Sequence, residues 1–297
     1  MAEYKDIHGT TIRNSAGNLA GAKTGELFYD STNRDFKYQY PNVTSAGSWS
    51  SGNNMNTERA YMGNTGIQTA ALSVGGATVP PIVANVEQYN GASWTEVGDI
   101  NTARWQLATG GTYTSAIGFG GSTDFPAPTG IANAETWNGS SWTEVSDLNT
   151  ARRATGSTGD ATAALAIGGE NNGASATESW NGSAWTTLPA TLNTGRGSAG
   201  SSKISTTSVL YFGGDIEAGR TGVTELYNGT SWSEQADLAL VRRNLGGAGS
   251  GGTSALAFGG EDSPAPSFAQ TEHWTGAGAP IGAWATAASM NTARYIM

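Results

Sequence analysis

The 297-residue chain has no cysteine, only two histidines and no long apolar run. The lack of cysteine excludes disulfides, thiolate metal sites and cysteine nucleophiles. His8 and His273 are too few for the histidine ligands of a copper oxidase site. No stretch approaches about 18 consecutive apolar residues, so the sequence predicts no transmembrane helix and no membrane insertion. The first residues also lack the apolar core of a signal peptide, and we expect no cleaved secretion signal.

Charge is scarce as well. Only 13% of the residues are charged, and the formal net charge is −9. Nucleic acid and anionic membranes are therefore poor partners for this chain. The sequence contains no phosphate-binding loop, no Ser/His/Asp constellation and no paired-carboxylate signature. We therefore expect no catalytic residues, no cofactor and no metal, and predict that the protein is not an enzyme.

Glycine and tryptophan are abundant instead, with 43 and 10 residues. Six tryptophans are each followed, ten or eleven residues later, by an arginine. The tryptophans are Trp49, Trp94, Trp142, Trp185, Trp232 and Trp284, and the arginines are Arg59, Arg104, Arg152, Arg196, Arg242 and Arg294. The segment before the arginine usually reads Asn-Thr-x-Arg, and residues 239–242 (ALVR) are the exception. Such regular spacing of large apolar residues argues against disorder.

Each period of 43–52 residues holds the same four elements. A weakly apolar segment follows the arginine, and an apolar run then ends in Gly-Gly. A segment with a glutamate and an aromatic residue comes next, and the tryptophan segment closes the period. Asn-Gly joins the last two segments in four copies and predicts type I′ hairpin turns. Four strands per repeat of this length indicate a β-propeller blade.

The arginine, the run into Gly-Gly, the aromatic residue and the tryptophan resemble the repeats of the Kelch family over about residues 36–294. The resemblance implies an all-β, Kelch-like β-propeller with four antiparallel strands per blade. We assign residues 24–297 to the propeller and residues 1–23 to an N-terminal arm, with one short strand around Thr10–Arg13.

We predict six blades, of which five lie between Arg59 and Trp284. The sixth blade would be split between the termini. Residues 25–50 would supply three strands, two of them from the hairpin expected over residues 24–40, and Arg294–Met297 would supply the innermost strand. Such closure would remove the exposed strand edges of an open ring. The alternative is a five-bladed propeller with a separate N-terminal hairpin.

The arginines are the main candidate ligand-binding residues. If each begins an innermost strand, then Arg59, Arg104, Arg152, Arg196, Arg242 and Arg294 surround the central channel on one face. They could bind an anionic ligand such as an acidic sugar through bidentate contacts. The alternative is that each arginine pairs with the glutamate of the third strand. We expect the ladder tryptophans to be structural, whereas Trp105, outside the ladder, is a candidate for an exposed ligand platform.

Acidic residues also gather just after the Gly-Gly pairs, at Asp124, Glu170, Asp215, Glu261 and Asp262. Calcium requires six to eight oxygen ligands, which one or two carboxylates per loop do not provide. We expect solvated loop charges at these positions.

The style of the repeats and the segment GELFYDSTNRDFKY resemble virion and tail-fibre proteins of tailed bacteriophages, particularly marine ones. This resemblance implies a virion structural protein, a tail fibre or surface appendage, located in the extracellular particle. The arm would contact other virion proteins, the propeller would bind host surface glycan or a virion protein, and the chain could form a homo-oligomer. The alternatives are a bacterial Kelch-type protein-interaction module and a glycan-active enzyme such as a sialidase-like hydrolase.

Overall fold

The computed structural model describes residues 13–15, 27–32, 34–38, 52–78, 81–125, 128–171, 174–262, 267–276 and 283–287. The regular elements in these ranges are all β-strands. The same ranges contain no helix that could cross a membrane. The chain divides into two compact units, Met1–Ser48 and Trp49–Met297.

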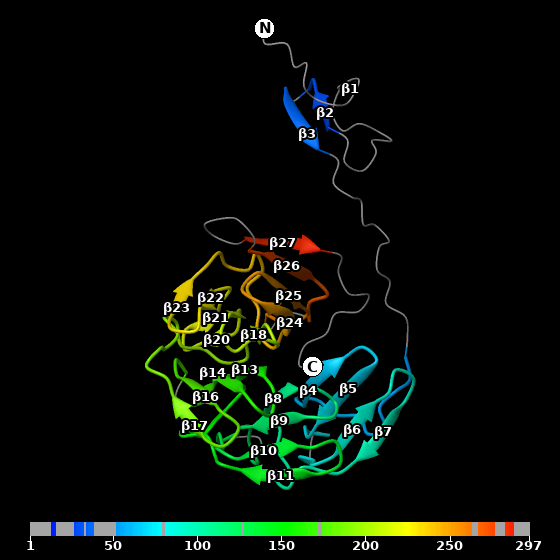
Figure 1. Ribbon diagram of the computed structural model, residues 1–297, viewed down its shortest axis with the longest axis vertical. Helices are drawn as coiled ribbons and strands as arrows, with labels where there is room; N and C mark the ends of the chain where they lie inside the picture. Colours follow the sequence, from blue (N-terminus) through cyan, green and yellow to red (C-terminus); the bar gives the residue numbers. More distant parts are fainter. Residues whose placement is uncertain are drawn as a thin grey trace. The chain divides into compact units, whose positions relative to one another are not determined.

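The second unit is a β-propeller whose blades are four-stranded antiparallel sheets (Figure 1). Blade 1 holds β4 (Gly63–Ile67), β5 (Ala70–Val74), β6 (Val86–Tyr89) and β7 (Trp94–Val97). Blade 2 holds β8 (Ala108–Gly111), β9 (Ala116–Phe119), β10 (Ala134–Trp137) and β11 (Trp142–Val145). Blade 3 holds β13 (Gly156–Gly159), β14 (Ala164–Ile167), β16 (Thr177–Trp180) and β17 (Trp185–Thr187).

Blade 4 holds β18 (Gly200–Ser201), β19 (Val209–Phe212), β22 (Thr224–Tyr227) and β23 (Trp232–Glu234). Blade 5 holds β24 (Gly246–Gly251), β25 (Ser254–Phe258), β26 (Thr271–Thr275) and β27 (Ala283–Ala287). Two short ribbons join loops near the blade ends. They are formed by β12 (Arg152–Arg153) with β15 (Glu170–Asn171) and by β20 (Asp215–Ile216) with β21 (Gly219–Arg220). The predicted order of four strands per repeat is therefore confirmed.

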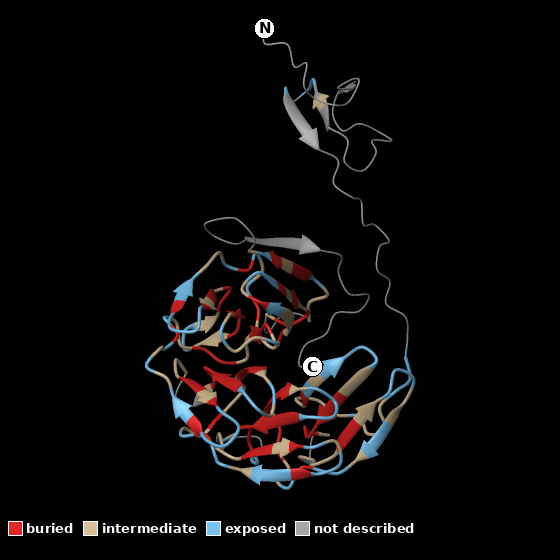
Figure 2. Cartoon of the chain, in the orientation of Figure 1, coloured by how far each residue is buried: buried red, intermediate tan, exposed pale blue. Residues whose placement is uncertain are grey.

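The first strand of each blade lies nearest the propeller axis, and the first strands of consecutive blades contact one another from blade 1 through blade 5. The second strands β9, β14 and β19 are buried along their whole length. Figure 2 shows exposed residues on the outermost strands β7, β11, β17 and β23. Strands buried on both faces require continuous apolar runs, and this is the pattern before each Gly-Gly.

Four apolar clusters join consecutive blades. In the first, Trp142 of blade 2 packs on Leu72 and Val74 of blade 1. In the next, Trp185 of blade 3 packs against Phe119 of blade 2, with ring centroids 4.8 Å apart. The tryptophan of a fourth strand thus covers the second strand of the preceding blade. The structural role predicted for the ladder is confirmed for these residues.

The Gly-Gly pairs form a second joint between blades. Gly120 and Gly121 both have left-handed backbones, with φ values of 63° and 102°. A Cβ atom on Gly120 would lie 2.6 Å from the carbonyl oxygen of Arg152 in the next blade. The N–H of Gly121 donates to that same oxygen at 3.0 Å. Only glycine combines this conformation with such close approach, which accounts for the repeated pair.

The Asn-Gly turns differ from the predicted type I′ geometry. Gly139 has φ of 96°, whereas Asn138 is not in the left-handed region. The loop is four residues long, because Trp137 pairs with Trp142. The Oδ1 atom of Asn138 accepts the N–H groups of Ser140 and Ser141, both at 3.0 Å. Asparagine is therefore used here for its side-chain acceptor rather than for a positive φ.

The predicted split sixth blade is wrong, because the propeller has five four-stranded blades. The expected hairpin is present as β2 (Leu27–Asp30) and β3 (Asp35–Tyr38), but it belongs to the first compact unit. The free edge of β2 pairs in parallel with β1 (Arg13–Ser15). In the predicted sixth blade, the C-terminal strand would have paired with this same edge of β2. Trp49 and Arg294–Met297 lie outside the described residues, and the alternative of five blades with a separate hairpin agrees with the sheets.

The last blade is less covered than the others. Leu256 and Phe258 are half-buried, whereas the equivalent Leu210 and Phe212 of blade 4 are fully buried between blades. Phe212 packs in the apolar cluster that joins blades 4 and 5. Equivalent side chains in two blades therefore have different environments, although their sequence contexts are alike.

Candidate functional site at the loop face

The five described ladder arginines are each paired with the glutamate of the third strand in their own blade. The N–O distances lie between 2.5 and 3.1 Å, and the arginine side chains are fully buried. The pairs are Arg59–Glu87, Arg104–Glu135, Arg152–Glu178, Arg196–Glu225 and Arg242–Glu272.

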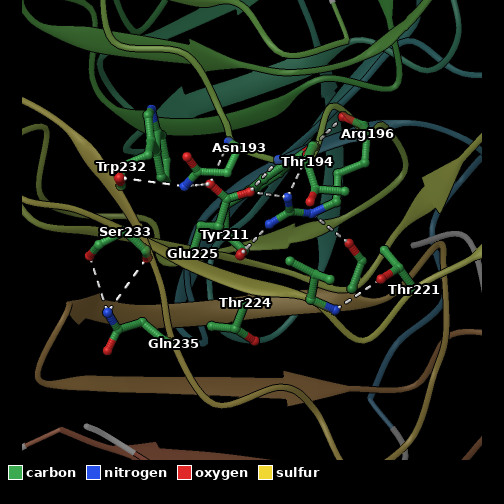
Figure 3. A network of polar contacts seen from close by, with 12 residues as sticks. Asn193, Thr194, Arg196, Tyr211, Thr221, Thr224, Glu225, Trp232, Ser233 and Gln235 are labelled. Carbon is green, nitrogen blue, oxygen red and sulfur yellow. Dashed lines mark hydrogen bonds and ion pairs between the residues drawn. The ribbon is translucent and has the colours of Figure 1, made fainter.

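Figure 3 shows the network around one of these pairs, Arg196 and Glu225. One carboxylate oxygen, Oε1, accepts from Arg196 and from the N–H of Thr194. The other, Oε2, accepts from the N–H and the side-chain amide of Asn193, at 2.8 and 2.9 Å. Arg196 also donates to the carbonyl of Tyr211, at 2.8 Å. The Asn-Thr-x-Arg segment is thus a set of donors around one buried carboxylate.

Burial and pairing change the pKa values of some of these groups. Burial lowers the pKa of the Arg152 guanidinium, and the charge of Glu178 opposes that effect. Burial raises the pKa of Glu87, but hydrogen bonds from Asn56, Arg59 and Thr57 outweigh it and leave the pKa lowered. A carboxyl whose folded pKa is lowered stabilises the fold above its unfolded pKa, and this stability is lost as the pH falls.

The predicted pairing of arginine with the third-strand glutamate is confirmed in the five described blades. Each of the five described arginine side chains is buried against the third strand of its own blade. Direct ligand contact would require breaking a buried ion pair, which is costly. Ligand binding by these arginines stays a prediction, and Arg294 lies outside the described residues.

Blade 5 departs from the donor pattern in a way that predicts a stabilising substitution. Ala239 stands where the other four blades have asparagine. Its N–H donates to Glu272 Oε2 at 2.8 Å, but it has no side-chain amide to donate a second hydrogen bond. We expect Ala239→Asn to raise the free energy of unfolding by about 0.5–1.5 kcal/mol, because it adds a buried hydrogen bond. Urea denaturation measures the change.

The matched control is Asn193→Ala, which removes the same amide from blade 4. It should lower the free energy of unfolding by at least a similar amount. A neutral result for both variants would contradict the role assigned to the asparagine amide.

A series of backbone hydrogen bonds joins the residues that stand two positions after the arginines. In all five blades this residue has φ between 51° and 59°, although none is glycine. In blades 2 to 5 its N–H group donates to the carbonyl of its counterpart in the preceding blade, at 2.8–3.0 Å. The residues are Tyr61, Gln106, Ala154, Ser198 and Asn244. Of these residue types, only asparagine commonly adopts a positive φ, so no sequence signal predicted this series of hydrogen bonds.

The predicted exposed platform at Trp105 is wrong, because the side chain is only 5% exposed. Its Nε1 atom donates to the carbonyl of Asp124 at 2.9 Å. Its ring lies between Tyr61 and Phe125, with centroid distances of 4.9 and 5.4 Å. Phe125 is the exposed member of this aromatic cluster, at 45%. The position of Phe125 in a variable loop after Gly-Gly is the signal that could have identified it.

Polar side chains continue from the aromatic cluster along the same face. Gln106 Oε1 accepts from Arg153 at 2.6 Å. Arg153 pairs with Glu170, also at 2.6 Å, and Glu170 accepts from the hydroxyl of Ser198. The chain of contacts joins blades 2, 3 and 4. All four side chains are only partly buried, so some of their polar atoms face solvent.

A second ion-pair group follows in blades 4 and 5. Arg243 pairs with Asp215 at 2.8 Å and with Glu261 at 3.0 Å. Arg220 lies 3.7 Å from Asp262. Hence four of the five acidic residues after Gly-Gly form ion pairs. Their side chains are 12–51% exposed, so these loop charges are both paired and in contact with solvent. No group of three or more potential metal ligands occurs among the described residues.

The face that carries these groups holds both the inter-blade linkers and the loops after Gly-Gly. We call it the loop face. Residues directly after the arginine pair with residues directly after Gly-Gly, as in Trp105 with Ser122 and Arg243 with Glu261. Both kinds of connection therefore lie on one face of the propeller. In blades 1 and 2 the loop face presents aromatic rings, and in blades 3 to 5 it presents charged and amide groups. Exposed aromatic and polar side chains that lie close together form a surface that can bind a polyhydroxylated ligand.

Comparison with known proteins gave no further identification, since no family model and no curated protein matches the chain.

Proposed function

We propose that the protein is a binding module whose loop face binds a glycan at Phe125. The observation that carries the proposal is the 45% exposure of Phe125, whose ring lies 5.4 Å from that of Trp105. Gln106, the next residue after Trp105, accepts a hydrogen bond from Arg153. An exposed ring can stack on the apolar face of a sugar, and neighbouring amide and guanidinium groups can bind its hydroxyls. Trp105 supports the site by packing behind Phe125.

We further propose a setting for this activity. The protein is a Kelch-like structural component of a tailed-phage virion, a tail fibre or surface appendage, and its ligand is a glycan of the host surface. Residues 1–23 attach it to other virion proteins. This part of the proposal rests on the repeat style and short motifs of the sequence. Antibody against the propeller should label negatively stained particles of the phage that carries the gene, and unlabelled particles would contradict it.

The glycan site predicts a loss of binding in Phe125→Ala. Burying a phenylalanine side chain contributes about 1.5–3 kcal/mol, so affinity for host surface polysaccharide should fall roughly tenfold to a hundredfold. Isothermal titration with purified polysaccharide measures the effect. Tyr113→Ala is the matched control, since Tyr113 is another exposed aromatic residue, at 39%, in a turn between first and second strands.

Equal binding by wild type and Phe125→Ala would contradict the proposed site. Turnover of a sialoside or polysaccharide would instead favour the alternative of a sialidase-like hydrolase. Failure of every glycan, together with capture of a defined virion or bacterial protein, would favour the alternative of a Kelch-type protein-interaction module.

A further inference from the structure

Lys203 departs from the repeat at a position near the propeller axis. It is the only lysine after residue 48. It stands seven residues after Arg196, where the other four described blades have glycine. Those glycines are Gly66, Gly111, Gly159 and Gly249, with φ values between 92° and 135°. Blade 4 therefore carries a long cationic side chain at the position where the other described blades have glycine.

The backbone places Lys203 among the inner strands. The N–H of Gly159 donates to the Lys203 carbonyl, and the N–H of Lys203 donates to the Gly249 carbonyl, both at 3.1 Å. Lys203 thus lies between the first strands of blades 3 and 5. We call the surface formed by β4, β8, β13, β18 and β24 the axial wall. Hydroxyl groups line part of this wall, and Ser157 and Ser201 bridge neighbouring blades through their Oγ atoms.

The ammonium group of Lys203 has one hydrogen-bond partner among the described residues. Its Nζ atom lies 3.1 Å from the Oγ atom of Ser157. Ser157 is 2% exposed and uses its own proton to donate to the Thr109 carbonyl, so its oxygen accepts from the lysine. An ammonium group has three donors, which leaves two for another acceptor.

No negative charge balances this ammonium group among the described residues. None of the ion pairs in those ranges includes Lys203. Lys203 as a whole is half-buried, and the loss of water around its amine lowers the pKa of Lys203 to about 8. A desolvated cation with a single neutral partner is unfavourable, and a bound anion would relieve that cost.

We propose that the axial wall binds a small oxyanion at Lys203. The two remaining N–H groups of the ammonium would donate to its oxygens. Inorganic phosphate, sulfate and small carboxylates share this chemistry. This site is separate from the glycan site at Phe125, and neither proposal depends on the other.

Isothermal titration of the full chain at pH 7 and low ionic strength tests the proposal, with phosphate, sulfate and acetate as separate probes. Wild-type protein should bind at least one probe with a stoichiometry of one. Lys203→Met should weaken that binding at least tenfold. Lys37→Met, which removes a lysine of the first compact unit, should leave it unchanged. Unaltered binding by Lys203→Met, or no heat with any probe, would overturn the proposal.

A second measurement uses the wild-type chain and does not depend on the folding of a variant. Biosynthetic incorporation of ¹³C,¹⁵N-lysine leaves the ammonium group unmodified, and NMR titration of the side-chain carbon shifts then reports the pKa of the Lys203 amine. Saturating phosphate, sulfate or acetate should raise this pKa, because a bound anion favours the charged form. An identical Lys203 titration curve with and without all three anions would also overturn the proposal.

Discussion

Replacing Glu178 with alanine should lower the free energy of unfolding by about 3–5 kcal/mol. The side chains of Glu178 and Arg152 are both fully buried and lie 2.7 Å apart. The same carboxylate accepts the N–H and side-chain amide of Asn149 and the N–H of Thr150. Its removal leaves a buried guanidinium without a counter-charge and several buried donors without an acceptor. Urea denaturation followed by tryptophan fluorescence measures the loss.

The matched control is Glu170→Ala in the same blade. Glu170 pairs with Arg153 at a similar distance of 2.6 Å, but its side chain is 26% exposed. Solvent screens such a pair, so the expected loss is about 1 kcal/mol or less. If Glu170→Ala destabilised the protein as strongly as Glu178→Ala, burial would not be the reason for the importance of the third-strand glutamates.

Replacing Phe212 with alanine should destabilise the propeller by about 3–5 kcal/mol, the usual cost of truncating a buried phenylalanine. Phe212 is fully buried in the cluster that joins blades 4 and 5. Phe258 precedes the Gly-Gly of blade 5 as Phe212 precedes that of blade 4, but Phe258 is half-buried. Phe258→Ala should therefore lower the free energy of unfolding by about 2 kcal/mol or less, because Phe258 buries less apolar surface on folding.

Paired denaturation experiments on Phe212→Ala and Phe258→Ala compare equivalent positions in the two blades. A Phe258→Ala loss as large as that of Phe212→Ala would show that Phe258 is covered as fully in solution. It would contradict the difference in burial between blades 4 and 5.

The strands were predictable because the signals for them are local. Three short segments identify each blade: the apolar run before Gly-Gly, the strand with the glutamate and the strand with the tryptophan. Their recurrence at a fixed spacing strengthens the prediction of each strand. The hairpin of β2 and β3 was equally predictable, since alternating residues flank a turn. The Asn-Gly turns show the limit of this reasoning. The location was right, but the choice between a positive φ and a side-chain acceptor at Asn138 depends on loop length.

The candidate site was less predictable because its parts lie far apart along the chain. The sequence left open whether Arg152 binds a ligand or Glu178, which is 26 residues away. Trp105 and Phe125 are 20 residues apart, and only their packing shows that the tryptophan is the covered ring and the phenylalanine the exposed one. No local pattern distinguishes these outcomes, because burial depends on neighbours that are distant along the chain.

The sequence by itself determined the all-β class, the four-strand blade and the structural use of the tryptophans, because these follow from spacing and composition along the chain. Only the tertiary structure decided the number of blades, the pairing of the arginines with glutamates and the burial of Trp105. It also placed Lys203 against Ser157 on the axial wall. The physical reason is that each of these properties depends on contacts between residues that are distant along the chain. One edge of β2, for example, pairs with β1.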